Sequence, residues 1–451
     1  MNISRCRKVV VVDFYWTRDK DPRVPLGHAS LVTALRELPG VDVRSLAIPV
    51  NLGGLDAESV AEQILGLADG RVGSAVDVAL GAYVWGEELL RQVLRKLRAK
   101  GFGGRIILGG PQISYSGPGL EKIYPEADVF VRGYGEDALR RLTGTHERQV
   151  IAGVHWAGTQ DREEQAQVDL EHLPSPWLTR AIPLEGQRFI RWETQRGCMF
   201  RCAFCQHREP GTRLKQRNLG LPRIEAEIDL FCASDVEEIA VLDPIFNMTP
   251  HAAGVLERFR DRGFQGRLSL QCRAETMTAE LFEAGRGLDL CLEFGLQTIH
   301  RAEMVAIRRN NHLPKVEEAL AQARHRGIDH EVSLIFGLPE QTLDSFMASV
   351  KWCLDRRVPV IKAFPLMLLR GTRLDREREK WGLEDSGGAM PMVLQASSFG
   401  YEEWRQMACL SEALRLTEGD HPQTLEELRI VGADLEPDVL RWMPAKPGRA
   451  A

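Results

Sequence analysis

The chain has 451 residues and a formal net charge of -5, with 44 % hydrophobic and 27 % charged residues. This balance argues against a disordered, collagenous or coiled-coil protein, and the length predicts two or three domains at roughly 150 residues each. The acidic excess gives no support to a nucleic-acid or anionic-membrane surface. No apolar run reaches the ~20 residues that cross a bilayer or the ~7 of a secretory signal. We therefore expect a cytoplasmic protein without nucleic-acid or membrane partners.

The first 150 residues alternate strand-like and helix-like patterns. Short apolar runs typical of buried parallel strands occur at 8–13, 76–84, 105–108 and 128–131. Helical spacing of apolar residues occurs at 26–38 and 87–97. This alternation predicts a doubly wound parallel sheet of the Rossmann type, whose ligands bind at the carboxyl ends of the strands. Five glycines fall at those ends, where they either admit a ligand or form tight turns: Gly86, Gly109, Gly110, Gly133 and Gly135.

Residues 151–185 have the composition of a connector, with a polar run and three prolines. Strand-like runs then resume at 189–193, 238–242, 268–271, 288–294, 331–336 and 360–364. Six β/α units predict a partial (β/α)6 TIM-type barrel over 186–385, with its chemistry at the strand carboxyl ends. Residues 386–451 contain amphipathic segments and no chemical motif, so we expect a small, mostly helical segment there.

Three of the nine cysteines, Cys198, Cys202 and Cys205, lie within eight residues in the spacing C-x3-C-x2-C. An odd count and this clustering argue against a disulfide framework and indicate metal ligation. Three thiolates on one loop can hold three irons of a cubane cluster and leave the fourth iron open for a small molecule. A zinc site with His207 as fourth ligand is the alternative. The others are expected to be small buried hydrophobes: Cys6, Cys232, Cys272, Cys291, Cys353 and Cys409.

The cysteine loop and the segments after it resemble the radical S-adenosylmethionine (SAM) superfamily. The resemblance runs from Glu193-Thr-Gln-Arg-Gly-Cys198 through Asp243-Pro-Ile-Phe-Asn247 to Ser333-Leu-Ile-Phe-Gly337-Leu-Pro-Glu340. It implies that the three cysteines bind a 4Fe–4S cluster, with Asp243 at the SAM amino group. Ser333 stands where the family often has glycine, which leaves the adenine contact open. The implied SAM pocket consists of Phe204, Asp243, Asn247, Gln271, Arg273, Glu275, Glu293, Gln297, Ile335, Gly337 and Glu340.

The resemblance also implies the chemistry. The reduced cluster binds SAM at the open iron, and electron transfer breaks the C5′–S bond to give methionine and a 5′-deoxyadenosyl radical. That radical removes a hydrogen atom from the substrate, while the barrel orients the substrate and excludes water. An electron donor such as flavodoxin or ferredoxin is then required as a partner.

The first domain resembles the cobalamin-binding-type domain that precedes many radical SAM barrels. The matching segments are Val24-Pro-Leu-Gly27, Tyr83-Val-Trp-Gly86, Leu108-Gly-Gly-Pro-Gln112 and Arg132-Gly-Tyr-Gly-Glu136. This implies that Gly109, Gly110 and Gly133 border a cobalamin. The Asp-x-His-x-x-Gly signature is absent, as is usual in this branch, so cobalamin would lack a histidine ligand. Alternatively the fold persists without the cofactor, and Tyr83 and Trp85 fill the corrin space.

Together these resemblances lead us to expect a radical SAM enzyme that acts on a small natural-product scaffold through cobalamin-dependent C-methylation. The alternative is cobalamin-independent diol dehydration of an amino sugar, as in aminoglycoside deoxygenation. A more remote alternative is an iron–sulfur electron carrier, although a carrier needs no nucleoside pocket. The acidic balance gives no support to a tRNA- or peptide-modifying role.

Overall fold

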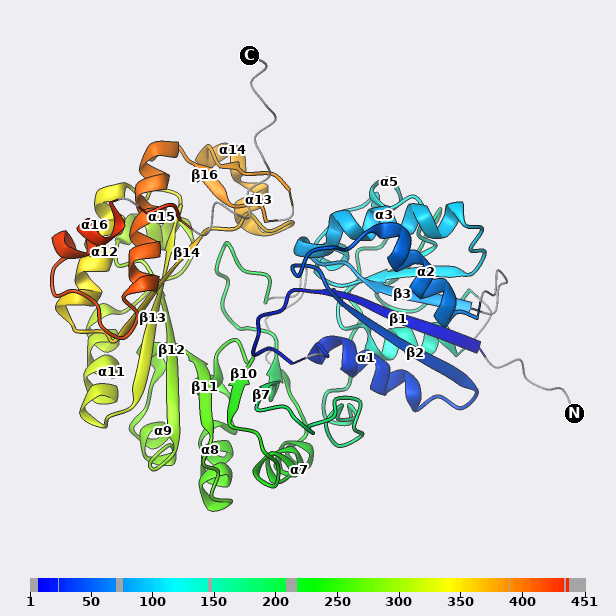
Figure 1. Cartoon of the computed structure of the whole chain (residues 1–451), viewed down its shortest axis with the longest axis horizontal. Coiled ribbons are helices and arrows are strands. Elements are labelled where there is room, and N and C mark those ends of the chain that lie inside the picture. Colours follow the sequence, from blue (N-terminus) through cyan, green and yellow to red (C-terminus); the bar gives the residue numbers. More distant parts are fainter. Residues whose placement is uncertain are drawn as a thin grey trace, which may run out of the picture. The chain divides into compact units, whose positions relative to one another are not determined.

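The computed structural model describes residues 7–22, 24–69, 76–144, 148–207, 217–388, 390–433 and 435–437 (Figure 1). The chain divides into two compact units. Unit 1 comprises Met1–Arg191 and Glu209–Val236, and unit 2 comprises Trp192–Arg208 and Glu237–Ala451. The division near residue 191 differs from the boundaries expected from composition, because residues 151–185 pack with unit 1 instead of forming a separate connector. Cys6 and the far carboxyl-terminal residues lie outside the described residues.

Unit 1 contains a six-stranded sheet in the order β2-β1-β3-β4-β5-β6. Strands β1 to β5 are parallel, and β6 is antiparallel to β5. The predicted doubly wound sheet is thus confirmed, and its order reverses between β1 and β3, the point at which such sheets bind ligands. The strands are β1 (Arg7–Tyr15), β2 (Val41–Pro49), β3 (Val76–Gly81), β4 (Arg105–Gly109), β5 (Val129–Val131) and β6 (Val154–Trp156).

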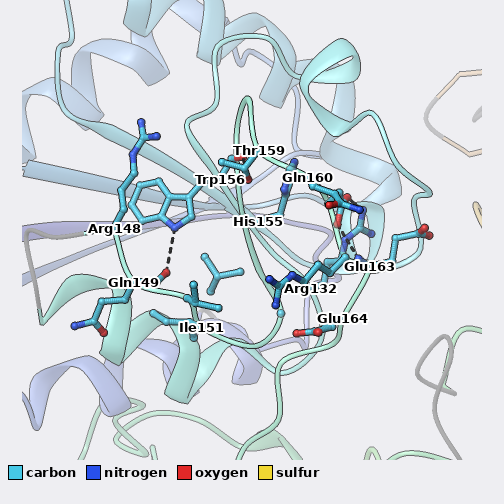
Figure 2. A pocket seen from close by; sticks show the side chains of 15 residues that line it. Arg132, Arg148, Gln149, Ile151, His155, Trp156, Thr159, Gln160, Glu163 and Glu164 are labelled. Atoms are coloured by element: carbon cyan, nitrogen blue, oxygen red, sulfur yellow. Dashed lines mark hydrogen bonds and ion pairs between the residues drawn. The ribbon is translucent and has the colours of Figure 1, made fainter.

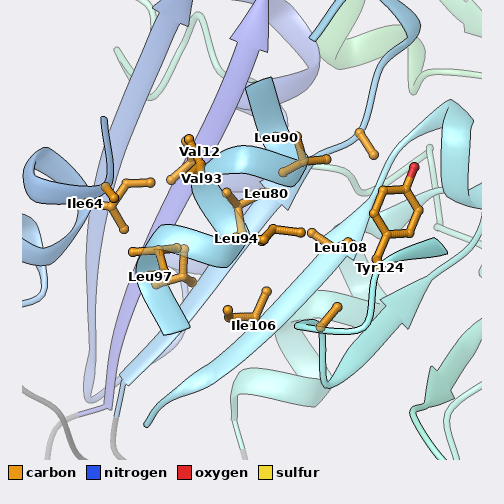
Figure 3. Packing of buried hydrophobic residues seen from close by; sticks show 14 of the residues in the cluster. Val12, Ile64, Leu80, Leu90, Val93, Leu94, Leu97, Ile106, Leu108 and Tyr124 are labelled. Atoms are coloured by element: carbon orange, nitrogen blue, oxygen red, sulfur yellow. The ribbon is translucent and has the colours of Figure 1, made fainter. Parts of the chain in front are cut away.

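Helices cover both faces of this sheet because its central strands are apolar on both sides. The helices of unit 1 are α1 (Leu26–Arg36), α2 (Ala57–Leu67), η1 (Val84–Gly86), α3 (Glu87–Ala99), α4 (Pro111–Ser114), α5 (Leu120–Ile123), α6 (Gly135–Thr143) and α7 (Leu221–Cys232). On one face Val12 of β1 packs with Ile64 of α2 and Leu94 of α3 (Figure 3). On the other face Val11 packs in a cluster that includes residues of α1 and α6. Burial on both faces explains the continuous apolar run of β1.

Two elements of unit 1 differ from the sequence prediction. Strand β2 was missed because it lies at the edge of the sheet and alternates charged residues such as Asp42 and Arg44 with half-buried ones. Strand β6 lies in the expected connector, where Leu170 and Trp177 are also buried. Edge strands carry weak hydrophobic patterns since only part of their surface is covered.

Unit 2 is built around a sheet in the order β14-β13-β12-β11-β10-β7. This sequential order, with parallel pairing from β10 to β14, is that of a partial (β/α) barrel and confirms the six predicted β/α units. The strands are β7 (Phe189–Trp192), β10 (Glu238–Val241), β11 (Arg267–Cys272), β12 (Asp289–Gln297), β13 (Asp329–Phe336) and β14 (Val360–Pro365). The helices that follow them are α8 (Ala252–Asp261), α9 (Ala279–Ala284), α10 (Arg301–Ala306), α11 (Leu313–His325) and α12 (Leu343–Asp355).

The carboxyl-terminal part of the chain contacts this sheet through one helix. In the longest helix of the segment, α15 (Tyr401–Leu416), the fully buried Trp404 lies 5.8 Å from Phe336 of β13 between ring centroids. The expected helical segment is therefore present and covers one end of the partial barrel sheet. The remaining elements are β8 (Gln195–Arg196), β9 (Arg217–Asn218), η2 (Phe246–Met248), η3 (Ala274–Thr276), α13 (Arg373–Arg376), α14 (Arg378–Trp381), β15 (Glu384–Asp385), β16 (Val393–Gln395) and α16 (Leu425–Gly432). Among the described residues, none of the helices has the length and apolar character that a membrane span requires.

Candidate cluster and cofactor site

The cysteine trio lies on the loop that follows β7 and β8, at the carboxyl end of the first barrel strand. Cys198, Cys202 and Cys205 are free thiols, and each is partly buried. The loop is fixed at its centre by Ala203, whose N–H donates to Ile307 O at 2.8 Å and whose carbonyl accepts from Leu374 N at 3.0 Å. The three sulfurs therefore sit on one short, anchored segment, as cluster ligation requires.

The three thiols and His207 are the candidate metal ligands of this loop. Within the described ranges, no group of three or more His, Cys, Asp and Glu side chains converges as the ligands of one metal ion do. In a cubane each thiolate binds a different iron, so the sulfurs stand apart. His207, the candidate fourth zinc ligand, is exposed and donates its backbone N–H to Cys205 Sγ at 3.4 Å.

Burial opposes ionisation of these thiols in the absence of metal. Desolvation raises the pKa of Cys198 and raises the pKa of Cys205 to about 12, and the neighbouring thiols add to both shifts. The guanidinium of Arg309 acts in the opposite direction on both pKa values. Because metal ligation requires thiolates, iron must displace protons that burial holds on the sulfurs.

Asp243, predicted to contact the SAM amino group, is fully buried after β10. Its Oδ1 accepts from Thr194 N at 2.7 Å and Gln195 N at 3.1 Å, and its Oδ2 accepts from the Thr194 hydroxyl. Burial raises the pKa of Asp243 to about 7, against the opposing effect of these hydrogen bonds. Both carboxylate oxygens accept hydrogen bonds from the chain, and these bonds fix the segment before the cysteine loop.

Asn247, Arg273 and Glu275 are brought together beside the cysteine loop. The Asn247 amide donates to Arg273 O at 2.9 Å and accepts from Arg273 N at 3.0 Å. Arg273 is 4 % exposed, pairs with Glu275 through Nε at 3.0 Å, and lies 3.9 Å above the Phe200 ring. Phe200 belongs to the loop, so this group holds the loop against the end of β11. Residues of the predicted pocket thus support the loop directly.

The turn after β13 is organised by two residues that the sequence analysis missed. Fully buried Gln341 accepts from Gly337 N at 2.7 Å and Leu338 N at 3.2 Å, and it donates to Ile335 O at 3.1 Å. Its amide nitrogen also donates to the Glu303 carboxylate at 3.4 Å. Glu303 itself accepts hydrogen bonds from two hydroxyl groups, each at 2.5 Å. The predicted Glu340, by contrast, is exposed at a φ of +65°. No sequence motif predicts that Gln341 is buried and Glu340 exposed, because the direction of the turn decides which of the two side chains points inward.

The other predicted pocket residues lie on the more open face of the sheet or beside the loop. In β12 the even-numbered Leu290 to Leu296 are buried, whereas Glu293 and Gln297 lie on the opposite, partly exposed face. The parallel register aligns Gln271 with Glu293 in one row across that face. Gln297 has a φ of +70° at a register shift of β12. Partly buried Ile335 shares the alternation of β13, and half-buried Phe204 precedes Cys205.

Backbone conformation and close packing explain two of the glycines at the edge of the unit 1 sheet. Gly110 has a φ of +96°, and a Cβ there would lie 2.9 Å from Ala82 O. Gly133 has a φ of +78°, and its Cβ would lie 2.6 Å from Ala166 O. Gly109 has ordinary space, with 3.6 Å between an added Cβ and Val131 O. Their positive φ and the close backbone therefore explain glycine at 110 and 133 without reference to a ligand.

A buried acid lies at the switch point between β1 and β3. Asp13 is 2 % exposed, and its Oδ1 has no hydrogen-bond partner among the described residues. Burial raises its pKa to about 7, and its charge in turn raises the pKa of Tyr83. Tyr83 stacks on Trp85 at 5.0 Å, and Trp85 donates to Phe14 O at 2.8 Å. An unsatisfied acceptor therefore lies at the carboxyl edge where such sheets bind ligands.

A cavity of about 320 Å³ lies elsewhere in unit 1 (Figure 2). It is lined by β6, by its flanking segments and by Arg132 after β5, and Arg132 pairs with Asp161 at 2.6 Å. Trp156 on its wall donates to Gln149 O at 3.4 Å, the bond dashed in Figure 2. None of the predicted site residues lines this cavity. It is therefore separate from the predicted cofactor contacts.

Comparison with known proteins agrees with this geometry. The Radical SAM superfamily model matches residues 192–353. The 2-(S-pantetheinyl)-carbapenam-3-carboxylate methyltransferase of Streptantibioticus cattleyicolor is 27 % identical over 64 % of this chain and 45 % of its own length. The cobalamin-dependent radical SAM methyltransferase TokK of Streptomyces tokunonensis is 26 % identical over 77 % of this chain and 57 % of its own. The chain thus spans about half the length of these curated relatives.

Solved structures show the same fold across both units. The radical SAM methyltransferase TsrM of Kitasatospora setae, with tryptophan and a SAM analogue bound, has a TM-score of 0.67 at 18 % identity over 89 % of this chain and 83 % of its own. The cobalamin-dependent radical enzyme OxsB, with aqua-cobalamin and SAM bound, has a TM-score of 0.66 at 15 % identity. The match covers 94 % of this chain and 70 % of the OxsB chain. Residues 192–353 of the chain thus match a radical SAM domain, and this domain follows a doubly wound α/β domain.

Proposed function

We propose that this chain is a cobalamin-dependent radical SAM methyltransferase that methylates a carbon atom of a small natural-product scaffold. The observation that carries the proposal is the anchored loop of three free thiols in a radical SAM domain. The similarity of the chain to TokK and to the carbapenam methyltransferase supports methylation over diol dehydration. A one-electron donor of the flavodoxin or ferredoxin class belongs to the same proposal.

The residues around the loop have separate tasks. Cys198, Cys202 and Cys205 would hold the 4Fe–4S cluster through thiolates. Asp243 fixes the segment before the loop, while Arg273 holds Phe200 within it. When bound, the cluster and SAM supply a 5′-deoxyadenosyl radical, and cobalamin supplies a methyl group. The partly exposed face of the barrel sheet, which carries Gln271 and Glu293, would make polar contacts to SAM or substrate.

Unit 1 fits cobalamin through one specific feature. The Asp13 carboxyl is buried at the β1–β3 switch point with an oxygen that no described residue satisfies. An orphaned buried acceptor costs about 1–3 kcal/mol unless a donor reaches it. Cobalamin carries primary amide donors around its corrin ring, which is the kind of group that this oxygen lacks. Gly109, with space for a neighbour, borders the same sheet edge.

Asp13 should make the stability of the free protein depend on pH. Because burial raises the folded-state pKa from 3.8 to about 7, the folded chain retains a proton that the unfolded chain has released in this range. The stabilisation is complete below about pH 4 and is lost as the pH rises through about 7, a change of roughly 4 kcal/mol. Urea unfolding of the wild type and of Asp13→Asn at several pH values measures it, and the difference between the two curves isolates Asp13. Parallel curves would contradict the assignment.

The reaction is tested with SAM alone, so the natural substrate is not needed. Anaerobic protein is reconstituted with iron, sulfide and hydroxocobalamin, reduced, and given SAM with a deuterated methyl group. We expect retained cobalamin, S-adenosylhomocysteine, deuterated methylcobalamin and slow release of 5′-deoxyadenosine. Formation of 5′-deoxyadenosine alone, by protein that retains no cobalamin, would sink the methylation proposal and favour dehydration.

A further inference from the structure

Arg309 is a buried cation directed at the cysteine loop. It follows α10, is 8 % exposed, and places a terminal guanidinium nitrogen 3.9 Å from Cys202 Sγ. A second terminal nitrogen donates to the carbonyl of Gly295 in β12. Its Nε has no hydrogen-bond partner within the described part of the chain. The side chain is thus held in place by the end of β12 and faces a ligand sulfur.

Arg309 forms no ion pair within the described residues, although the nearby Glu275 carboxylate acts to raise its pKa. Arg273, the other buried arginine beside the loop, pairs with Glu275, whereas no carboxylate of the described residues forms an ion pair with Arg309. Burial and the nearby Arg273 both lower the pKa of Arg309, with burial the larger effect. Isolating a buried cation is costly, and it persists where a negative partner offsets that cost. Glu275 already pairs with Arg273, which leaves the Cys202 sulfur, 3.9 Å from Arg309, as the candidate for that partner.

We propose that Arg309 raises the reduction potential of the cluster held by Cys198, Cys202 and Cys205. This inference rests on the proposed cluster ligation. With three thiolates the oxidised cluster carries one net negative charge, and one electron from a flavodoxin-type donor makes it two. A fixed positive charge at Cys202 stabilises the doubly negative form more than the singly negative form. Hydrogen bonds to cluster sulfurs act in the same direction.

The test measures the midpoint potential, not activity. Wild type and Arg309→Gln are reconstituted anaerobically and titrated with dithionite in the absence of SAM, with the reduced cluster followed by EPR. Arg309→Gln should be at least tenfold less reduced at the wild-type midpoint, which is a fall of about 59 mV for a one-electron couple. Arg309→Lys keeps the charge without the planar fork, so its midpoint should lie between the two.

A neighbouring arginine provides the matched control. Arg308 is exposed at a φ of +54°, a conformation that asparagine tolerates. Arg308→Asn removes the same charge one residue away and should leave the midpoint unchanged, because solvent screens it. An Arg308→Asn midpoint that falls as far as that of Arg309→Gln would overturn the specific role of Arg309.

Other outcomes are distinguishable. An unchanged midpoint in Arg309→Gln with full iron content overturns the inference, and a loss of SAM affinity alone would make Arg309 a SAM-binding residue instead. If Arg309→Gln does not retain four irons, the midpoint potential of Arg309→Lys tests the proposal instead. A midpoint of Arg309→Lys at or above that of the wild type refutes the proposal. If the wild type itself binds no cluster, the proposed function fails first.

Discussion

Cys202→Ala protein, reconstituted anaerobically with iron and sulfide, is expected to contain far fewer than four irons per chain and to release no 5′-deoxyadenosine from SAM. The loop supplies three thiolates, and a cubane left with two protein ligands loses the arrangement that keeps one iron open for SAM. Cys198→Ala and Cys205→Ala should behave alike, since each thiol serves a different iron. Iron and sulfide analysis together with 5′-deoxyadenosine assays measure both effects.

Cys353→Ala is the matched control for the loss of one thiol. Cys353 is fully buried in α12 among apolar residues, so its removal should cost about 1 kcal/mol of stability and leave the iron content unchanged. Normal iron content in Cys202→Ala would contradict cluster ligation by the loop. In that case the cysteines would contribute only to the structure of the loop.

The sequence predicted the fold well because central strands carry a strong signal. Strand β1 is covered on both faces, and its apolar run is therefore continuous. The same physics explains the omissions, because β2 and β6 lie at the sheet edges and have little apolar surface to bury. The connector expected over 151–185 was misleading for a related reason. Its prolines and polar residues alternate with single buried anchors such as Trp177, which no periodicity reveals.

The candidate site could be predicted from spacing only where all its residues lie on one loop. The spacing of the cysteine trio fixes its grouping, but the contacts of Arg309 and Gln341 depend on turns whose direction the sequence does not encode in any motif. Glu340 and Gln341 are adjacent, yet one is exposed and the other is fully buried. Similarly, Gly110 is required by its positive φ and by the approach of Ala82, so its presence alone does not indicate a ligand.

Asp243→Ala should destabilise unit 2 and disorder the cysteine loop, not merely weaken SAM binding. Removing the carboxylate leaves the Thr194 N–H, the Gln195 N–H and the Thr194 hydroxyl without their acceptor in a fully buried position. Each orphaned donor costs about 1–3 kcal/mol, so a loss of at least about 3 kcal/mol is expected. Urea unfolding gives the free energy, and reconstitution of the folded fraction gives the iron content, which should fall.

The matched variant is Thr194→Val, which removes only the hydroxyl and retains both N–H donors to Oδ1. It should cost about 1–2 kcal/mol and leave the iron content nearly normal, because the backbone of the segment stays anchored. The two roles considered for Asp243 predict different results. A residue that only binds the SAM amino group would give an Asp243→Ala protein of wild-type stability and full iron content, with SAM affinity reduced ten- to a hundredfold, as about 1.5–3 kcal/mol predicts. Because both oxygens of the carboxylate already accept from the chain, we expect the loss of stability and of iron instead.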